Sequence, residues 1–346
     1  MSNNITKVTR LKCLLNEALI IDGLPGCGKT LFNSILETFE RVEILQFSPI
    51  LENLCALYDL KKIDYNAVQT LIKIEFDLMI YESMMARNTN FRYNDLSSVF
   101  RSSKKIEYFK RLFSKGEEII PKEIINKKPI LHLATHNLLS YSKPLFNALG
   151  EKVKMIEIVR HPLYMIIQQS LNYETIQETN GSRQFYVHLN QTRGSIPFWA
   201  NDWNESFHSL NYVEKAILEI YTFSQRTKRF KKKFSQQNLI TIPFETFVLE
   251  PFQFLKKIEA FLKVKPTKST FNRLKYEKVP RVKIADGIPL EIYKRCGWVP
   301  SDKKLTEREE LNKRREYAIN QGVKEKFINI LDKMSNDYEE EYNLNF

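Results

Sequence analysis

The chain has 346 residues, of which 43% are hydrophobic and only ten are glycine, so it can bury a large core. No stretch is long and apolar enough to span a bilayer, the N-terminus lacks the apolar run of a signal peptide, and four scattered cysteines show no metal-ligand spacing. We therefore expect a reduced, cytoplasmic protein. The net charge of +12 favours anionic partners, but no RNA-binding aromatic motif accompanies the basic segment 226–234, so we expect no nucleic acid.

The first informative segment is IIDGLPGCGKTLF at 20–32. Residues Gly23–Thr30 fit the phosphate-loop pattern G-x-x-x-x-G-K-[ST]. An apolar run, 18–21, precedes the loop and predicts a strand, and 31–38 predict a helix. This is the context in which backbone N–H groups and a helix N-terminus bind phosphate. The sequence therefore predicts a phosphate-binding loop.

Short β-branched runs alternate with helical patterns along the rest of the chain. Helices are expected within 50–86, where Leu71, Ile74 and Leu78 have helical spacing. Residues 87–105 are expected to form a polar loop or lid, and 173–210 look irregular. The other expected elements are strands at 42–47, 129–136, 152–160 and 238–245, and helices at 144–149, 163–172, 213–234 and 251–262 and from 302 onward.

This alternation predicts a doubly wound, mainly parallel α/β sheet flanked by helices, with helical insertions and a helical C-terminus. We expect a single domain over 1–346. Ligands bind such sheets beyond the carboxyl ends of the strands. The loop and three strand-end residues, His136, Arg160 and Glu245, should therefore lie at one rim. His132 lies farther back on its strand and is expected to be structural.

Four segments in order resemble the sulfotransferases that use 3′-phosphoadenosine 5′-phosphosulfate (PAPS). They are GLPGCGKTLF, HLATHNLLSYSKPLF, KVKMIEIVRHPLYMIIQQSL and ITIPFETFVLEPFQFLKKIEAFL. The resemblance covers about 18–34, 129–172 and 238–263. Three positions depart from the family pattern. Gly26 replaces the family's loop lysine, Ala134 replaces the lysine before the histidine, and Gln168 stands where a serine is expected.

The resemblance implies metal-independent, in-line transfer of a sulfonyl group from PAPS to a hydroxyl, leaving 3′-phosphoadenosine 5′-phosphate (PAP). His136 would be the base, and Lys29 would stabilise the leaving phosphate. Arg160 would bind the 3′-phosphate, and His161 is expected to be structural. The remaining donor contacts are expected from Pro25, Gly26, Cys27, Gly28, Thr30, Gln168, Ser170, Arg281 and Lys283.

The acceptor is expected to be a glycan or a small hydroxylated metabolite. The insertions 50–128 and 173–235 would form its side of the site or a lid. Candidate contacts there are Arg87, Arg92 and Trp199, because exposed tryptophan beside polar side chains suits sugar stacking. Glu245, at a strand end, is a further substrate contact or a rival base.

Two other functions stay open. The first is a P-loop kinase that phosphorylates a small metabolite with magnesium-ATP, which would explain Lys29 and Thr30 well. A kinase usually takes a second magnesium ligand from an acid at a neighbouring strand end, and only Glu245 and, less well, Asp22 are placed for it. The second is a nucleotide-binding module without catalysis.

Overall fold

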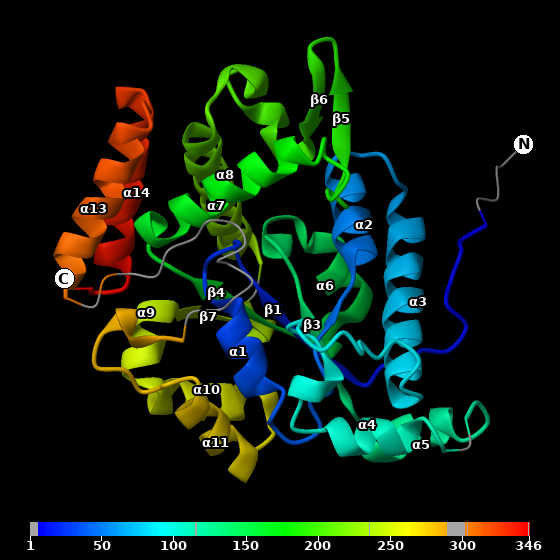
Figure 1. Ribbon diagram of the computed structural model, residues 1–346. Helices are drawn as coiled ribbons and strands as arrows, with labels where there is room; N and C mark the ends of the chain where they lie inside the picture. The colour runs from blue at the N-terminus through cyan, green and yellow to red at the C-terminus, as the bar shows by residue number, and fades with distance from the viewer. Residues whose placement is uncertain (1–5, 115, 235, 289–301, 303, 345) are drawn as a thin grey trace, which may run out of the picture.

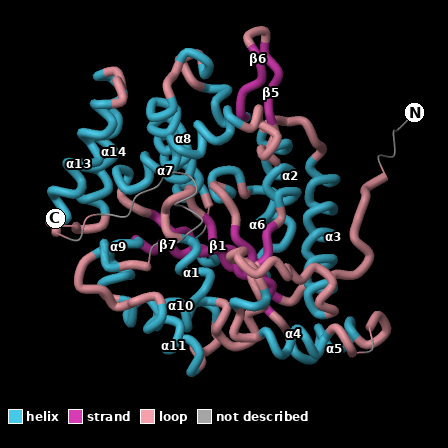
Figure 2. Tube along the Cα trace, viewed as in Figure 1, coloured by secondary structure: helices cyan, strands magenta, loops and turns pink. Residues whose placement is uncertain are grey.

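The computed structural model describes residues 6–114, 116–234, 236–288, 302, 304–344 and 346. A five-stranded parallel sheet lies at the centre of the molecule, in the order β2-β3-β1-β4-β7 (Figure 2). A separate antiparallel hairpin, β5–β6, projects away from it. The strands are β1 (Glu17–Asp22), β2 (Gln46–Phe47), β3 (Ile130–Ala134), β4 (Val153–Val159), β5 (His188–Gln191), β6 (Gly194–Pro197) and β7 (Leu239–Pro243).

Helices cover both faces of the sheet (Figure 1). They are α1 (Lys29–Leu36), α2 (Pro49–Asp59), α3 (Tyr65–Met84), α4 (Lys105–Arg111), α5 (Ile120–Lys127), α6 (Lys143–Leu149), α7 (Pro162–Glu178), α8 (Tyr212–Lys233), α9 (Phe244–Leu249), α10 (Pro251–Leu262), α11 (Lys268–Tyr276), α13 (Glu307–Asn320) and α14 (Glu325–Glu341). No helix within the described ranges is long and apolar enough to cross a membrane.

Alternation along β1 divides the core into two clusters. Leu19 and Ile21 pack with α1, α7, α10, α13 and α14, whereas Ala18 and Ile20 pack with α2, α3, α5 and α6. Successive side chains of a strand point to opposite faces. Because helices cover both faces, the central strand is buried on both sides, and its sequence is a continuous apolar run. This is the doubly wound α/β architecture expected from the sequence.

The parallel register brings the carboxyl ends of the strands to one edge. Phe47 pairs with Ala134, Ala134 with Ile21, and Val159 with Pro243. The order along this edge is therefore the end of β2, the residues after β3, the phosphate loop after β1, and the residues after β4 and β7. The topology alone places the segment after β3 between the loop and the end of β2.

Most of the predicted elements are confirmed, and three expectations need correction. The strand expected at 42–47 is only two residues long, because Val42 makes an isolated bridge to Ile130 before the pairing resumes at Gln46. The segment 173–210 is not wholly irregular, since it contains the end of α7 and the hairpin β5–β6. On α3 the helix is confirmed, but Leu71, Ile74 and Leu78 face solvent.

Candidate active site

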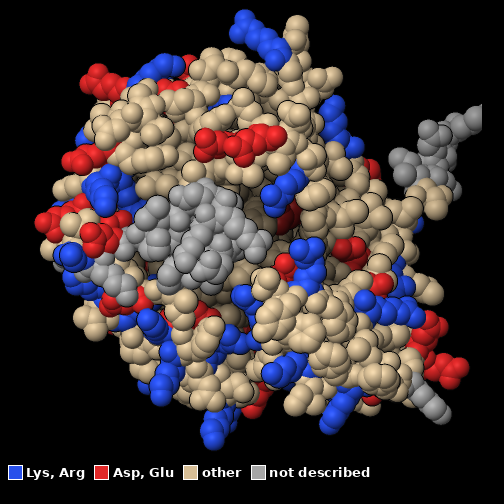
Figure 3. Space-filling model, viewed as in Figure 1, with Lys and Arg blue, Asp and Glu red and all other residues tan. Residues whose placement is uncertain are grey.

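A cleft of about 740 Å³ lies at the carboxyl edge of the sheet. Its floor is the phosphate loop and the start of α1. One wall comes from the end of β2 and the loop before α4, and the other from the residues after β4, from α11 and from 281–288. This volume is within the range of sites that enclose small molecules and cofactors. In the face shown in Figure 3, the surface is hollowed above this edge of the sheet.

The phosphate loop needs glycine at its last bend. Gly28 has φ of +97° and forms the N-cap of α1, and a Cβ there would lie 2.2 Å from the ring of Phe244. Any other residue would be strained by the backbone conformation and would collide with that ring. The Lys29 ammonium turns back over the loop and donates a hydrogen bond to the Gly23 carbonyl. Its positive charge therefore sits at the place where the N-terminus of α1 already favours an anion.

A second cationic group lies beside the loop. The Arg160 guanidinium donates to the Gly26 carbonyl from Nη1 (2.9 Å) and stacks between the rings of Phe244 and Tyr164, 4.4 and 4.8 Å from their centroids. Arg281 stacks over Phe244 as well, at 5.6 Å. Burial and the nearby Arg160 charge lower the pKa of Arg281 to about 10. The two arginines therefore converge on the same side of the cleft.

Within the described part of the chain, neither arginine has all of its donors satisfied. The buried Nε–H groups of Arg160 and Arg281 have no hydrogen-bond partner among the described residues. The nearest carboxylate to Arg160 is Glu245, at 3.9 Å. A buried donor without a partner is costly, and two close guanidinium groups repel each other. An anion bound between them would relieve both penalties.

His136 lies at the cleft, after the end of β3, with 48% of its side chain exposed. Its Nδ1 is 3.3 Å from Oε1 of Glu52 on α2, and the same oxygen accepts the His136 backbone N–H (3.0 Å). A carboxylate at Nδ1 favours the tautomer in which Nε2 is free to accept a proton. The sequence did not point to Glu52, because 84 residues separate it from His136.

The turn that carries His136 is fixed by Asp22. Its buried carboxylate accepts the Thr135 hydroxyl (2.7 Å) and the backbone N–H groups of Leu138 (3.0 Å) and Leu139 (2.9 Å). Asp22 was considered from the sequence as a weak magnesium ligand. The structure instead places it beneath the turn, where both carboxylate oxygens already accept hydrogen bonds. No signal in the sequence distinguished a magnesium ligand from a carboxylate that holds this turn.

The cleft brings together nine of the predicted site residues. These are Pro25, Gly26, Gly28, Lys29, Thr30, His136, Arg160, Gln168 and Arg281.

The other predicted donor contacts lie outside the lining. Cys27 is buried beneath the loop, and burial raises the pKa of its thiol. Ser170 is buried between α7 and α13, where its hydroxyl donates to the Ile167 carbonyl and lies 3.2 Å from the Tyr317 hydroxyl. The Lys283 ammonium donates weakly to the Leu305 carbonyl, at 3.5 Å.

The predicted acceptor contacts are also elsewhere. Arg87 forms an exposed ion pair with Glu117, and Arg92 with Asp95. Trp199 is core, with its ring against Tyr186, Phe198 and Phe223, so it offers no exposed face to a sugar.

Glu245 is completely buried behind Arg160. It accepts the His161 backbone N–H and the Tyr338 hydroxyl, at 3.0 and 2.7 Å, and burial raises its pKa. A strand-end carboxylate can thus point away from the cleft, which the sequence pattern alone does not reveal.

The two neighbouring histidines have structural contacts. His132 is buried and bonds Asn33 through Nε2, at 3.0 Å, and burial lowers its pKa to about 3. His161 caps α7 by accepting the Leu163 N–H, and burial lowers its pKa to about 4. Both rings are therefore neutral at pH 7, and neither lines the cleft.

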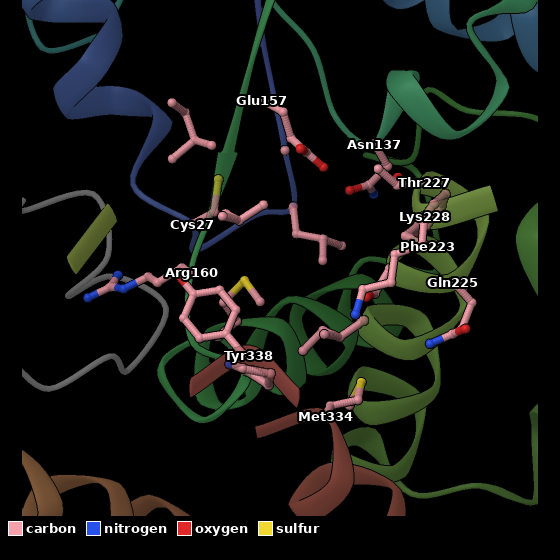
Figure 4. Close-up of a pocket in the computed structure, with 18 of the residues that line it drawn as sticks. Cys27, Asn137, Glu157, Arg160, Phe223, Gln225, Thr227, Lys228, Met334 and Tyr338 are labelled. Carbon is pink, nitrogen blue, oxygen red and sulfur yellow. The ribbon is translucent and has the colours of Figure 1, made fainter. Parts of the chain in front are cut away.

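A smaller cavity of about 100 Å³ lies on the other side of the loop (Figure 4). Glu157 points toward it from β4, Asn137 from the turn after β3 and Lys228 from α8, whereas Arg160 extends away from it. Its cations already have acidic partners: Lys231 pairs with Glu157, and Lys228 with Glu341. The larger cleft is therefore the better candidate for an anionic ligand.

No protein-family model matches the chain, and no curated protein matches its sequence. Similar solved structures include the sulfotransferase domain from the Synechococcus PCC 7002 olefin synthase, which is 11% identical with a TM-score of 0.39 and covers 90% of this chain and 98% of that one. Sulfotransferase STF9 from Mycobacterium avium is 12% identical, with a TM-score of 0.38 and coverage of 89% and 77%. Mouse sulfotransferase SULT7A1 complexed with PAP is 11% identical, with a TM-score of 0.37 and coverage of 92% and 89%.

All three of these solved structures are sulfotransferases. At these identities and scores the likeness says nothing of the donor, the acceptor or the activity. Those depend on the side chains in the cleft.

Proposed function

We propose that the cleft binds PAPS and that the protein transfers its sulfonyl group to a hydroxyl of a glycan or small metabolite. The observation that supports this proposal is that two groups of positive charge line the cleft. One is the loop with Lys29 at the start of α1, and the other is the Arg160–Arg281 pair. PAPS carries a phosphosulfate at its 5′ end and a phosphate at its 3′ position, and so has an anion for each.

The same geometry favours PAPS over ATP. ATP has phosphates at its 5′ end alone, so it would leave the two arginines facing a ribose hydroxyl. A kinase would also need a carboxylate for magnesium near Thr30. Of the two acids that the sequence suggested for this role, Asp22 is bound to the turn after β3 and Glu245 is buried behind Arg160. A magnesium-ATP kinase is therefore the second candidate.

Each role in the transfer has a residue at the cleft. His136 would take the acceptor proton at Nε2, with Glu52 holding the ring through Nδ1. Lys29 would stabilise the charge that develops on the leaving phosphate. Bound PAPS would supply the sulfonyl group. The strand order puts His136 between the loop and Phe47, so the acceptor would enter from the β2 side.

Calorimetry with PAP, ADP and ATP, each with and without magnesium, tests this function. We expect PAP to bind ~10- to 100-fold more tightly than ADP, without magnesium, because charge-assisted hydrogen bonds contribute ~1.5–3 kcal/mol each. Arg160→Gln should remove most of this preference. Arg229→Gln is the matched control, because Arg229 is exposed on α8, outside the cleft, and bonds the Gln225 carbonyl.

Tighter binding of magnesium-ATP than of PAP by the wild type would favour the kinase. Tight PAP binding without any release of PAP from PAPS, across glycan and small-alcohol acceptors, would favour a binding module without catalysis. An equal loss of PAP affinity in the Arg160 and Arg229 variants would contradict the assigned 3′-phosphate site.

A further inference from the structure

The segment 91–113, between the cleft and α5, exposes an unusual set of side chains. Tyr93, Ile106 and Phe113 are 73, 66 and 88% exposed. Phe91, Phe100 and Phe109 are less exposed and contact one another, with ring centroids 5.9 to 6.2 Å apart, and Tyr93 lies 5.8 Å from Phe100. Ile106 and Phe109 are three residues apart on α4 and share a face. Five of these side chains therefore form one apolar surface, and exposed Phe113 follows it two residues after the end of α4.

Basic residues are interleaved with these apolar ones. Arg92, Arg101, Lys105 and Lys110 are each next to one of the six in the sequence, and all four are exposed. The two acidic residues of the segment are already paired, Asp95 with Arg92 and Glu107 with Arg111. Figure 3 shows an uncharged area over the loop before α4, with Lys and Arg side chains and some acidic ones at its edges. We call this surface the aromatic–basic surface.

We propose that the aromatic–basic surface docks the protein on an anionic lipid bilayer. Exposed aromatic and aliphatic side chains flanked by lysine and arginine combine the two terms that bind a protein to such a surface: apolar burial at the headgroup boundary and attraction to anionic lipid. A monomeric protein rarely leaves a continuous apolar patch uncovered. A second copy of the chain is a poor occupant, because two such surfaces would bring like charges together.

The aromatic–basic surface adjoins the mouth of the cleft. Tyr93 and Phe100 belong to the aromatic–basic surface and also line the cleft on its β2 side. The cleft mouth would therefore lie next to the bilayer when the protein is docked. The docking itself depends on neither the donor nor the chemistry proposed above, and it can be tested without a nucleotide.

Sedimentation with vesicles tests the proposal on the full chain. Wild-type protein should bind vesicles of phosphatidylserine and phosphatidylcholine, bind phosphatidylcholine vesicles at least ~10-fold more weakly, and dissociate as salt rises. The double variant Ile106→Asn, Phe113→Ser should lower binding to the anionic vesicles by ~10-fold or more. The matched control is Phe185→Ser with Phe252→Ser, which removes two exposed aromatic residues outside the surface.

A second pair of variants tests the charges and does not depend on the first pair being folded. Lys105→Glu with Lys110→Glu should abolish binding to anionic vesicles, whereas Lys256→Glu with Lys257→Glu, on exposed positions of α10, should leave it nearly unchanged. Melting by circular dichroism shows that each variant is folded. The proposal is overturned if the wild type ignores anionic vesicles, or if surface and control variants lose binding equally. It is also overturned if the wild type binds a single-stranded oligonucleotide tightly but does not bind anionic vesicles at matched phosphate concentration.

Discussion

Three buried carboxylates, those of Asp22, Glu245 and Glu219, differ in their surroundings. Asp22 and Glu245 each accept hydrogen bonds at both oxygens. Glu219 on α8 is equally buried, and burial raises its pKa to about 7. Sequence reasoning could place Glu245 at a strand end, but not on which side of the backbone its side chain would lie. The prediction that Trp199 contacts the acceptor was wrong for a similar reason. Its burial depends on packing against Tyr186 and Phe223, which the local sequence does not reveal.

The raised pKa of Glu219 makes its contribution to stability depend on pH. The folded protein keeps the Glu219 proton up to about pH 7, whereas the unfolded chain releases it near pH 4.5. This contribution is therefore present below pH 4.5 and is lost as the pH rises through 7. Glu219→Gln should stabilise the protein by up to about 3 kcal/mol at pH 8 and by almost nothing at pH 4. Urea unfolding at both values checks this, with exposed Glu174→Gln as control; a gain that does not change with pH would contradict it.

The pairing of His136 with Glu52 gives a second prediction at this scale. His136→Ala should slow the release of PAP from PAPS in the presence of acceptor by ~100-fold or more, with PAP affinity nearly unchanged. Glu52→Gln should slow it less, because the ring loses the carboxylate that holds it through Nδ1. His208→Ala, at an exposed position outside the cleft, is the control. Loss of PAP affinity in the His136 variant would place this residue in donor binding instead.

Single elements differ in how well the sequence predicted them. The strand, loop and helix around Gly23–Thr30 were predictable, because a glycine pattern and an apolar run fix them locally. The hairpin β5–β6 was not, since its strand His188–Gln191 is largely polar and lacks a buried face. On α3 the apolar residues occupy more than one face, so helical spacing predicted the helix but not the side that packs. The turn after β3 depends on Asp22, across 113 residues from Thr135, and no local signal reports it.

That turn gives a prediction at the scale of an element. Asp22→Asn places an amide where Oδ2 accepts the Leu139 N–H, so a donor faces a donor. We expect a loss of ~1–3 kcal/mol in stability, faster hydrogen exchange at Leu138 and Leu139, and slower release of PAP from PAPS. Asp77→Asn is a matched control, because Asp77 is also buried and accepts the N–H groups of Leu14 and Leu15 far from the cleft. If both variants lose activity alike, Asp22 does no more than stabilise the fold.

At the scale of the whole molecule, the two core clusters share one sheet. β1 and β4 contribute side chains to both, so neither cluster can unfold and leave the other intact. A ligand that binds only the folded state stabilises it by RT ln(1 + [L]/Kd), or ~2.7 kcal/mol at one hundred times Kd.

The doubly wound architecture was predictable from the alternation of strands and helices. The convergence of Arg160 and Arg281 was not, because it depends on how α9 presents Phe244.

PAP should therefore raise the stability of both clusters together. In urea, peptides from α3 and from α10 should lose protection against hydrogen exchange at the same denaturant concentration, and saturating PAP should raise that concentration equally for both. ADP at the same concentration should raise it less. Separate midpoints for the two peptides, or a shift by PAP in α10 alone, would show that the clusters unfold independently.

The order of the strands along the carboxyl edge has a consequence for how such a protein can diversify. The proposed donor contacts come from the segments after β1, β4 and α11, and the proposed acceptor side comes from β2 and from the loop before α4, with His136 between them. Descendants of one ancestral gene could therefore exchange or lengthen the segment 87–113 and acquire new acceptors, while selection keeps the donor half unchanged. Grafting that segment between relatives would then be a way to engineer new specificities on one fixed donor site.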